Sequence, residues 1–218
     1  MRNRFVQQLD ELNRELIAMA ARVEGAILLA VEGLMDSDAD KARRAIDADG
    51  EIDELERDIE RRCLKLLLSQ QPVASDLRRI STALKMITDM ERIGDHAEDI
   101  SEITLRLLGP GALPKPEPIR AMARETTAML SGSIDAFVRQ DQALAEAIIA
   151  RDDAVDGLFG QVQADLLAVI AQQPARGAEA MDLMMVAKYF ERIGDHAVNL
   201  AEWAIFSLTG LHKAQRIL

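Results

Sequence analysis

The chain has 218 residues, 49% of them apolar, and carries a formal net charge of −11 at pH 7. This length and apolar content suffice for a large core, and an aromatic content of only 3% favours helices over sheets. The negative charge excludes a net field that would attract phosphates of nucleic acid or anionic lipid, so we expect no nucleic-acid partner.

Helical periodicity predicts three long helices in each half of the chain. The expected helices run over Phe5 to Met35, about 39–70 and about 75–108, and then over about 119–139, 142–172 and 177–208. Their expected N-caps are Ser37 or Asp38, Ser75 and Asp141. Proline ends helices, and all six prolines stand at three breaks: Pro72, Pro174 and the segment GPGALPKPEP.

The GPGALPKPEP segment at 109–118 indicates a linker between two domains. We expect one three-helix bundle over 1–108 and a second over 117–218. The seven residues ERIGDHA occur at 91–97 and again at 191–197, and both copies follow a Gln-Gln-Pro turn. A period near 100 residues matches a duplicated domain rather than a solenoid repeat. The predicted fold is therefore all-α, with two tandem three-helix bundles and six long helices.

The single cysteine and the N-terminal sequence bear on the cellular compartment. Cys63 has no internal disulfide partner and stands beside Ile59 and Leu66, where a buried thiol acts as a small apolar group. The N-terminal residues MRNRFVQQLDELNREL lack the apolar run of a signal peptide, and the apolar runs at 26–31 and 166–171 are too short to cross a bilayer. We expect a cytoplasmic protein that reaches a membrane only through partners.

Carboxylates replace apolar residues along the seams of the predicted helices. Asp152 is the one charged residue in an otherwise apolar stripe, and Glu91 continues the stripe of the third helix. Each carboxylate has a second one four residues further on, on the same helix face. In an antiparallel hairpin, facing residues are equidistant from the turn. The carboxylates of the first half pair about Pro72 in this way, and those of the second half about the peptide bond before Pro174.

This register predicts one cluster of four carboxylates in each bundle. The eight residues are Asp49, Asp53, Glu91 and Asp95, and Asp152, Asp156, Glu191 and Asp195. Four like charges in a seam repel one another and lose hydration, unless a hard cation with oxygen ligands neutralises them. Gly94 and Gly194 flank the carboxylates and allow the facing helix to come close. Asp99 is a candidate additional ligand, and the matching position in the second half is Asn199.

Ion pairing is the alternative to a metal, with Arg92 and Arg192 neutralising the clusters. His96 and His196 lie about 100° around the helix from the aspartates, so we expect each to make a hydrogen bond or a salt link near Arg92 or Arg192 instead. A di-iron enzyme needs histidine three residues after a metal-binding glutamate, where this chain has glycine. No P-loop, HExxH or GxSxG motif occurs, and we predict no enzyme.

With QQPVASDLRRI at 70–80, ERIGDHAEDI at 91–100, QQP at 172–174 and ERIGDHAVNLAEW at 191–203, the chain resembles the PhoU family over essentially its whole length. The family comprises regulators of bacterial phosphate uptake. The resemblance implies two three-helix bundles and clusters of iron, zinc, manganese, nickel or magnesium at E/D-x-x-x-D motifs. These motifs are Asp49 with Asp53, Glu91 with Asp95, Asp152 with Asp156, and Glu191 with Asp195.

The resemblance also implies a role in phosphate homeostasis. A PhoU protein is expected to hold the phosphate-starvation (Pho) response off when phosphate is plentiful, as a negative regulator. It would act as a homodimeric adaptor between the ATPase subunit of a phosphate ABC transporter and the sensor histidine kinase of the phosphate two-component system. Two alternatives stay open: a metal-dependent hydrolase or oxidase at the carboxylate clusters, and a metal-free helical scaffold.

Overall fold

The structure is a computed structural model that describes residues 2–70, 72, 74–109, 111–213 and 215–216. The expected turn residue Gln71 and the expected linker residue Pro110 lie outside the described residues. The elements in chain order are α1 (Arg2–Asp36), α2 (Ala39–Gln70), α3 (Ala74–Arg106), α4 (Pro118–Arg139), α5 (Gln142–Ile149), α6 (Asp152–Gln172), the 3₁₀ turn η1 (Pro174–Arg176), α7 (Gly177–Thr209), β1 (Leu211–His212) and β2 (Gln215–Arg216).

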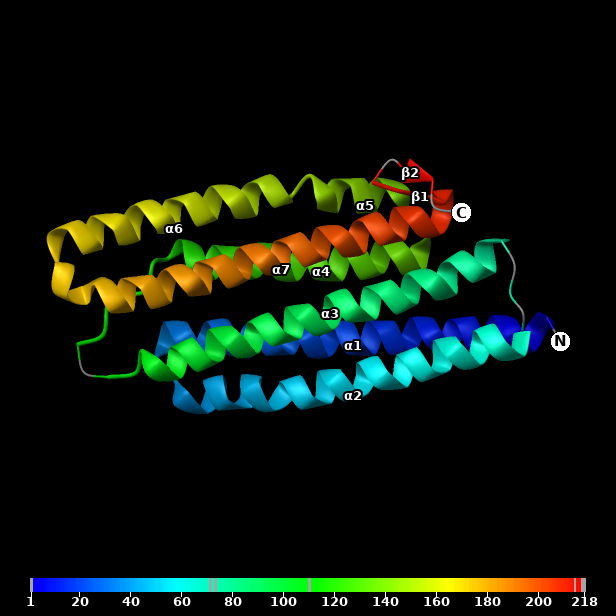
Figure 1. The fold of residues 1–218 in the computed structure, drawn as a ribbon, viewed down its shortest axis with the longest axis horizontal. Coiled ribbons are helices and arrows are strands. Elements are labelled where there is room, and N and C mark those ends of the chain that lie inside the picture. Colours follow the sequence, from blue (N-terminus) through cyan, green and yellow to red (C-terminus); the bar gives the residue numbers. More distant parts are fainter. Residues whose placement is uncertain (1, 71, 73, 110, 214, 217–218) are drawn as a thin grey trace.

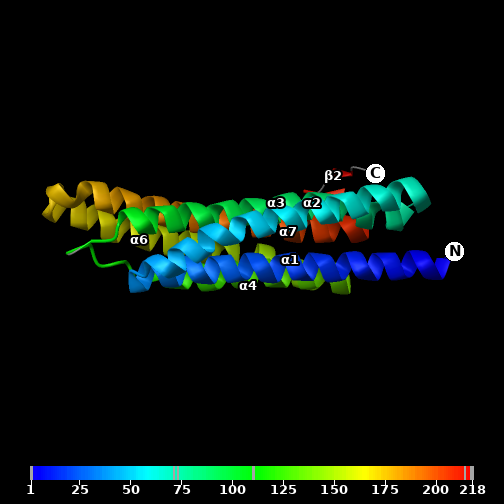
Figure 2. The same ribbon diagram turned by 90° about the horizontal axis from the view of Figure 1, so that it is seen from below.

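The long helices lie side by side in two layers (Figures 1 and 2). α1 and α4 form one layer, and α2, α3, α7 and α6 form the other, with α3 and α7 in contact at its centre. α1, α2 and α3 pack on one another as one bundle, and α4 packs with α5, α6 and α7 as the other. The all-α, duplicated three-helix fold predicted from the sequence is therefore confirmed.

The linker between α3 and α4 is hydrogen-bonded to residues at the start of α7. Leu113 is buried in the core, and its backbone N–H donates to Glu179 Oε2 at 3.1 Å. Arg176 Nη2 donates to the carbonyl oxygen of Gly111 at 2.7 Å. These contacts fix the point where the chain passes from α3 to α4.

Two of the three N-caps expected from the sequence are confirmed. Asp38 Oδ1 accepts the backbone N–H groups of Asp40 and Lys41 at the start of α2, and Asp141 caps α5 through Leu144 N at 3.0 Å. The expected N-cap at Ser75 is wrong, because α3 already begins at Ala74.

The helix expected over 142–172 is interrupted, which corrects the sequence prediction. Ala150 and Arg151 separate α5 from α6, and Arg151 N bonds to Ile148 O at 3.0 Å, the tighter three-residue spacing. Ile148 packs closely on Gly132 of α4, where an added Cβ would lie 2.4 Å from Ile148 Cδ1. The interruption places Asp152 in the first turn of α6.

The structure confirms that Cys63 is buried, as expected from its apolar neighbours. Cys63 is fully buried, and desolvation raises the pKa of its thiol to about 12.

One stretch of the described chain, Gln142–Gln172, is long and apolar enough to cross a membrane by length and composition alone. Only 17% of its most apolar window is buried, so α6 presents much of its surface outward.

Candidate metal centre

In the first bundle, α2 and α3 bring their carboxylates to one level. Burial, followed by the negative charges of Asp95 and Asp53, raises the pKa of Asp49 above its ordinary value. Burial and the charge of Asp95 likewise raise the pKa of Glu91, and the charge of Asp53 on α2 contributes. Because these charges act on one another across the α2–α3 contact, the four side chains predicted to meet do form one electrostatic cluster.

The second bundle repeats this arrangement with a stronger effect. Burial, then the charges of Asp156, Asp195 and Glu191, raises the pKa of Asp152 to about 6. The pKa of Asp195 is also raised, first by burial and then by Glu191. The first two turns of α6 therefore face the middle of α7 through four mutually repelling carboxylates.

The two glycines of the repeated motif hold the facing helices close. An added Cβ at Gly94 would lie 3.1 Å from Ile52 Cδ1 and 3.5 Å from Asp49 Oδ1. At Gly194 it would lie 3.2 Å from Asp152 Oδ1 and 3.4 Å from Val155 Cγ1. Glycine at this position therefore sets the distance between each aspartate and the opposite helix.

Basic side chains at the rim partly neutralise the clusters. Arg92 Nη1 lies 2.7 Å from Asp95 Oδ2, and its Nε lies 3.4 Å from Glu91 Oε2. Arg57, on α2, pairs with Asp53 at 2.6 Å. In the second bundle, Lys188 reaches Glu191 at 2.5 Å and thus takes the place expected for Arg192. Arg57 and Arg92 are largely exposed and Lys188 is half-buried, so the pairs of the two arginines are weak.

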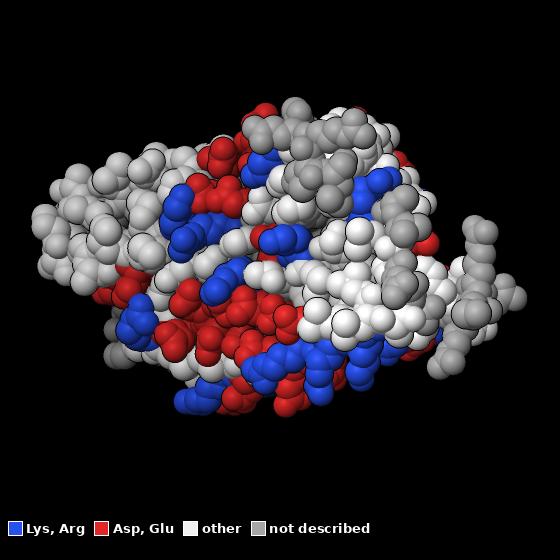
Figure 3. Space-filling model, turned by 45° about the vertical axis from the view of Figure 1, so that its right-hand side comes forward, with Lys and Arg blue, Asp and Glu red and all other residues white. Residues whose placement is uncertain are grey.

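Carboxylate oxygens are the ligands that a hard cation prefers, whereas the side chains as they stand in the structure do not form a coordination shell. Asp49 Oδ1 is buried and has no hydrogen-bond partner, which is where a cation would supply the missing charge. Among the described residues, no group of three or more His, Cys, Asp or Glu side chains is arranged to hold a metal ion. Figure 3 shows acidic side chains gathered on one face of the molecule and bordered by basic ones.

Two further glutamates belong to the first cluster and were not predicted. The pKa of Glu56 is raised by burial and by the charges of Glu60 and Asp53, and that of Glu98 by burial and by Asp49. Glu56 stands on the same stripe as Asp49, so the periodicity carried a signal for it. Glu98 stands seven residues after Glu91 on the stripe of α3, so the same periodicity carried a signal for it as well.

The candidate additional ligands have other contacts. Asp99 adds to the raised pKa of Asp49, but its Oδ2 lies 3.5 Å from His96 Nδ1. Asn199 Nδ2 donates to Asp89 Oδ1 on α3 at 3.4 Å. Asn199 therefore joins the contact between the bundles.

The histidines of the two motifs meet at the α3–α7 contact, and their ring nitrogens face Asp99 and Asp89 rather than the eight clustered carboxylates. The rings of His96 and His196 are 5.6 Å apart between centroids, and His96 also lies 5.4 Å from the ring of Tyr189. His196 Nδ1 lies 2.9 Å from Asp89 Oδ1. The expected hydrogen bond exists, but its partner is an aspartate of the other bundle.

The fold and the paired clusters define a class of all-helical proteins in which a three-helix bundle with a carboxylate-bearing hairpin occurs twice. The PhoU domain matches this chain twice, over residues 16–104 and 119–204, and the chain belongs to the PhoU family.

Relatives of known sequence and structure agree with this assignment. The chain is similar to the phosphate-specific transport system accessory protein PhoU homolog of Clostridium acetobutylicum, with 35% identity over 94% of each chain. It is 38% identical to the homolog of the same name from Aquifex aeolicus, over 87% of this chain and 86% of that one. The crystal structure of PhoU from Pseudomonas aeruginosa matches with a TM-score of 0.88 at 31% identity, covering 94% of this chain and 99% of that chain.

Proposed function

We propose that the protein is a cytoplasmic, metal-binding accessory protein of a phosphate transport system that negatively regulates the phosphate-starvation response. The relatives are named as accessory proteins of a phosphate-specific transport system. The observation that carries the metal-binding part is the duplicated cluster, in which the partly buried Asp49 and Asp152 are repelled by neighbouring carboxylates and Asp49 Oδ1 has no hydrogen-bond partner. The two helix pairs belong to copies of one duplicated domain, and both keep the same unfavourable arrangement, which a bound cation would offset.

The ligands of the proposed sites are Asp49, Asp53, Glu91 and Asp95 in the first bundle and Asp152, Asp156, Glu191 and Asp195 in the second. An oxygen-only ligand set suits iron, manganese or magnesium, and zinc and nickel are further candidates. When bound, the cation neutralises the carboxylates and ties α2 to α3, or α6 to α7. Arg57 and Arg92 are exposed and can move aside as the carboxylates turn inward.

The proposed action is that of an adaptor rather than an enzyme. As partners we propose the ATPase subunit of a phosphate ABC transporter and the sensor histidine kinase of the phosphate two-component system, with the protein acting as a homodimer. Family membership supports this proposal. A deletion of the gene should raise phosphate-regulated expression in phosphate-rich medium, once paralogues are excluded.

Elemental analysis together with thermal melts before and after chelation tests the metal sites. We expect bound metal, and a melting temperature about 5–10 °C lower once it is removed, since binding at 100 times Kd contributes about 2.7 kcal/mol. Asp49→Asn combined with Asp152→Asn should abolish the difference. The control pair Asp58→Asn and Asp165→Asn, on exposed surfaces of α2 and α6, should retain it. Absence of metal and no response to chelator would support the scaffold that the rim ion pairs favour.

A further inference from the structure

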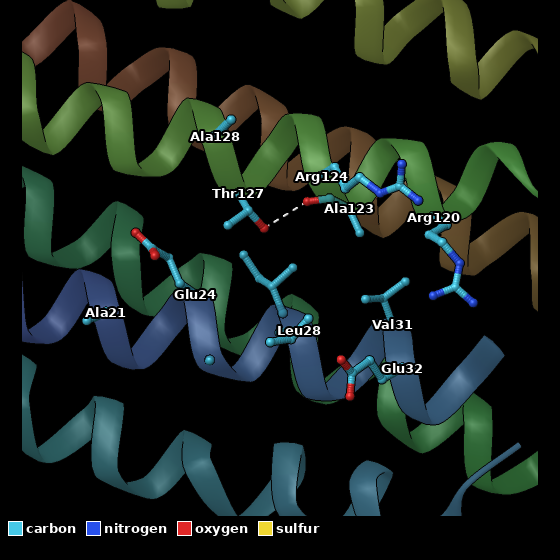
Figure 4. Close-up of a pocket in the computed structure, with 12 residues that line it drawn as sticks. Ala21, Glu24, Leu28, Val31, Glu32, Arg120, Ala123, Arg124, Thr127 and Ala128 are labelled. Carbon is cyan, nitrogen blue, oxygen red and sulfur yellow. Dashed lines mark hydrogen bonds between the residues drawn. The ribbon is translucent and has the colours of Figure 1, made fainter. Parts of the chain in front are cut away.

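A groove of about 570 Å³ runs between α1 and α4, on elements that carry none of the clustered carboxylates (Figure 4). Its floor is apolar and buried, formed by Ile27, Val31 and Ala123. Leu28 stands on its wall and is 55% exposed. A large aliphatic residue left open beside a buried apolar floor is typical of a surface that another molecule covers.

Small residues keep this groove open. Ala21 and Gly25 line it on α1, and Ala128 lines it on α4. A Cβ atom added at Gly25 would meet nothing within 4 Å. Glycine inside a helix costs about 1 kcal/mol relative to alanine, and no contact in the described chain requires it here. The space above Gly25 is therefore available to a ligand.

The two walls of the groove differ in their free charge. On α1, Glu24 accepts a hydrogen bond from Ser131 Oγ, and Glu32 pairs with Lys41 at 3.0 Å. On α4, Arg120 and Arg124 stand four residues apart on one face. Arg120 Nε lies 3.9 Å from Glu117 Oε1, at the limit of an ion pair, and no described carboxylate pairs with Arg124.

We propose that this groove binds an amphipathic helix of a partner protein, whose apolar ridge fills the groove and whose acidic side chains pair with Arg120 and Arg124. A groove between two helices takes a third helix through anchors three and four residues apart. The positive charge of Arg124, with which no described carboxylate pairs, and of the weakly paired Arg120 selects acidic neighbours for that ridge. In a symmetric contact with a second copy, the carboxylates that this face offers to the arginines are Glu24 and Glu32, which already bind Ser131 and Lys41, so a separate acidic partner is favoured.

Two designed peptides of about 18 residues, long enough to form a helix, provide the probes. Both carry the same leucine ridge, which is flanked by Glu in one peptide and by Lys in the other. Fluorescence anisotropy with the full chain should give a Kd below about 100 μM for the Glu peptide and binding at least tenfold weaker for the Lys peptide.

Variants separate groove binding from general adhesion. Gly25→Leu fills the groove and should abolish binding, whereas Gly160→Leu on α6, where a Cβ also meets open space, should leave it unchanged. The double variant Arg120→Glu with Arg124→Glu should lose about tenfold in affinity for the Glu peptide and gain affinity for the Lys peptide. Arg139→Glu, at the far end of α4, is the control. A misfolded variant cannot reverse its charge preference in this way.

Three results would overturn the proposal: equal binding of both peptides, binding that Gly25→Leu does not change, or no binding of either peptide at about 1 mM. A dimer that dissociates in Gly25→Leu, seen by sedimentation, would assign the groove to a second copy instead. The same peptide titrations are repeated after chelation. Because the groove and the clusters share no residue, these titrations distinguish a failure of this proposal from a failure of the metal sites.

Discussion

Gly194 of α7 faces Asp152 of α6 so closely that a Cβ atom at position 194 would lie 3.2 Å from Asp152 Oδ1. We predict that Gly194→Ala weakens metal retention by the second bundle. The added methyl group takes the space into which the Asp152 carboxylate must turn to reach a shared ion. In the metal-free protein the crowding opposes a gain in helix propensity of about 1 kcal/mol, so the net change in stability should be small.

Titration of the metal-free variant with Mn²⁺, followed by thermal melts, measures this effect. The stabilisation by metal should shrink markedly in Gly194→Ala. Gly160→Ala on α6 is the matched control, because a Cβ there meets nothing within 4 Å. It should raise the free energy of unfolding by about 1 kcal/mol and leave the response to Mn²⁺ intact. Equal responses in both variants would contradict the role given to Gly194.

The raised pKa of Asp152 predicts how the stability of the chelated protein depends on pH. Its pKa is about 6 in the folded chain, above its ordinary value of 3.8, so the folded state holds a proton more tightly than the unfolded state. The resulting stabilisation is complete below about pH 3.8 and is lost as the pH rises through about 6. The melting temperature of the chelated protein should therefore fall between pH 5 and pH 7.5.

The variant Asp152→Asn isolates this contribution, since its side chain cannot ionise. Its melting temperature should fall less over the same range. The slope of the free energy of unfolding against pH should differ between the two proteins by the equivalent of less than one bound proton. Asp165→Asn, on the exposed side of α6, should follow the unmodified chain. Parallel curves for all three proteins would show that the Asp152 carboxylate does not titrate in this range.

The carboxylate clusters could be predicted from the sequence because they depend on two regular quantities. The helical repeat places Asp49 and Asp53 on one face, and the proline turn sets which residues of the next helix face them. Gly94 follows from the same register. The spacing of carboxylates along an apolar stripe depends only on the sequence of one helix, so it does not change when the helices pack.

The interruption after α5 and the partner of His196 could not be predicted in this way. Nothing in the sequence around Ala150 breaks a helix, and the tightening there accompanies the packing of Ile148 on Gly132 of another helix. The bond from His196 to Asp89 joins residues 107 positions apart, across the contact of two bundles. The first feature depends on helix packing within the second bundle and the second on how the two halves dock, and a single-helix pattern contains neither.

Cys63 provides a test of the first core. Its thiol is fully buried, and burial raises its pKa to about 12, so the reactive thiolate is scarce at neutral pH. We predict negligible reaction with a thiol reagent at pH 8 in the folded chain and full reaction in denaturant. Cys63→Ser should lower the free energy of unfolding by about 1–3 kcal/mol, because a hydroxyl would be buried without a designed partner. Rapid labelling of the folded chain would show that the α1–α2–α3 core opens there.

The contact between Asp89 and His196 predicts an energetic link between the two bundles. His196 Nδ1 lies 2.9 Å from Asp89 Oδ1, and both side chains are mostly buried, so the pair is shielded from salt. A double-mutant cycle with Asp89→Asn and His196→Phe, measured by urea unfolding, should give a coupling energy of about 0.5–3 kcal/mol. The exposed pair of Asp58 and Arg61 is the control and should give no more than about 0.5 kcal/mol. Strong coupling together with a single unfolding transition would mean that the two bundles unfold as one unit, whereas zero coupling would mean that this pair adds nothing to the other contacts between α3 and α7.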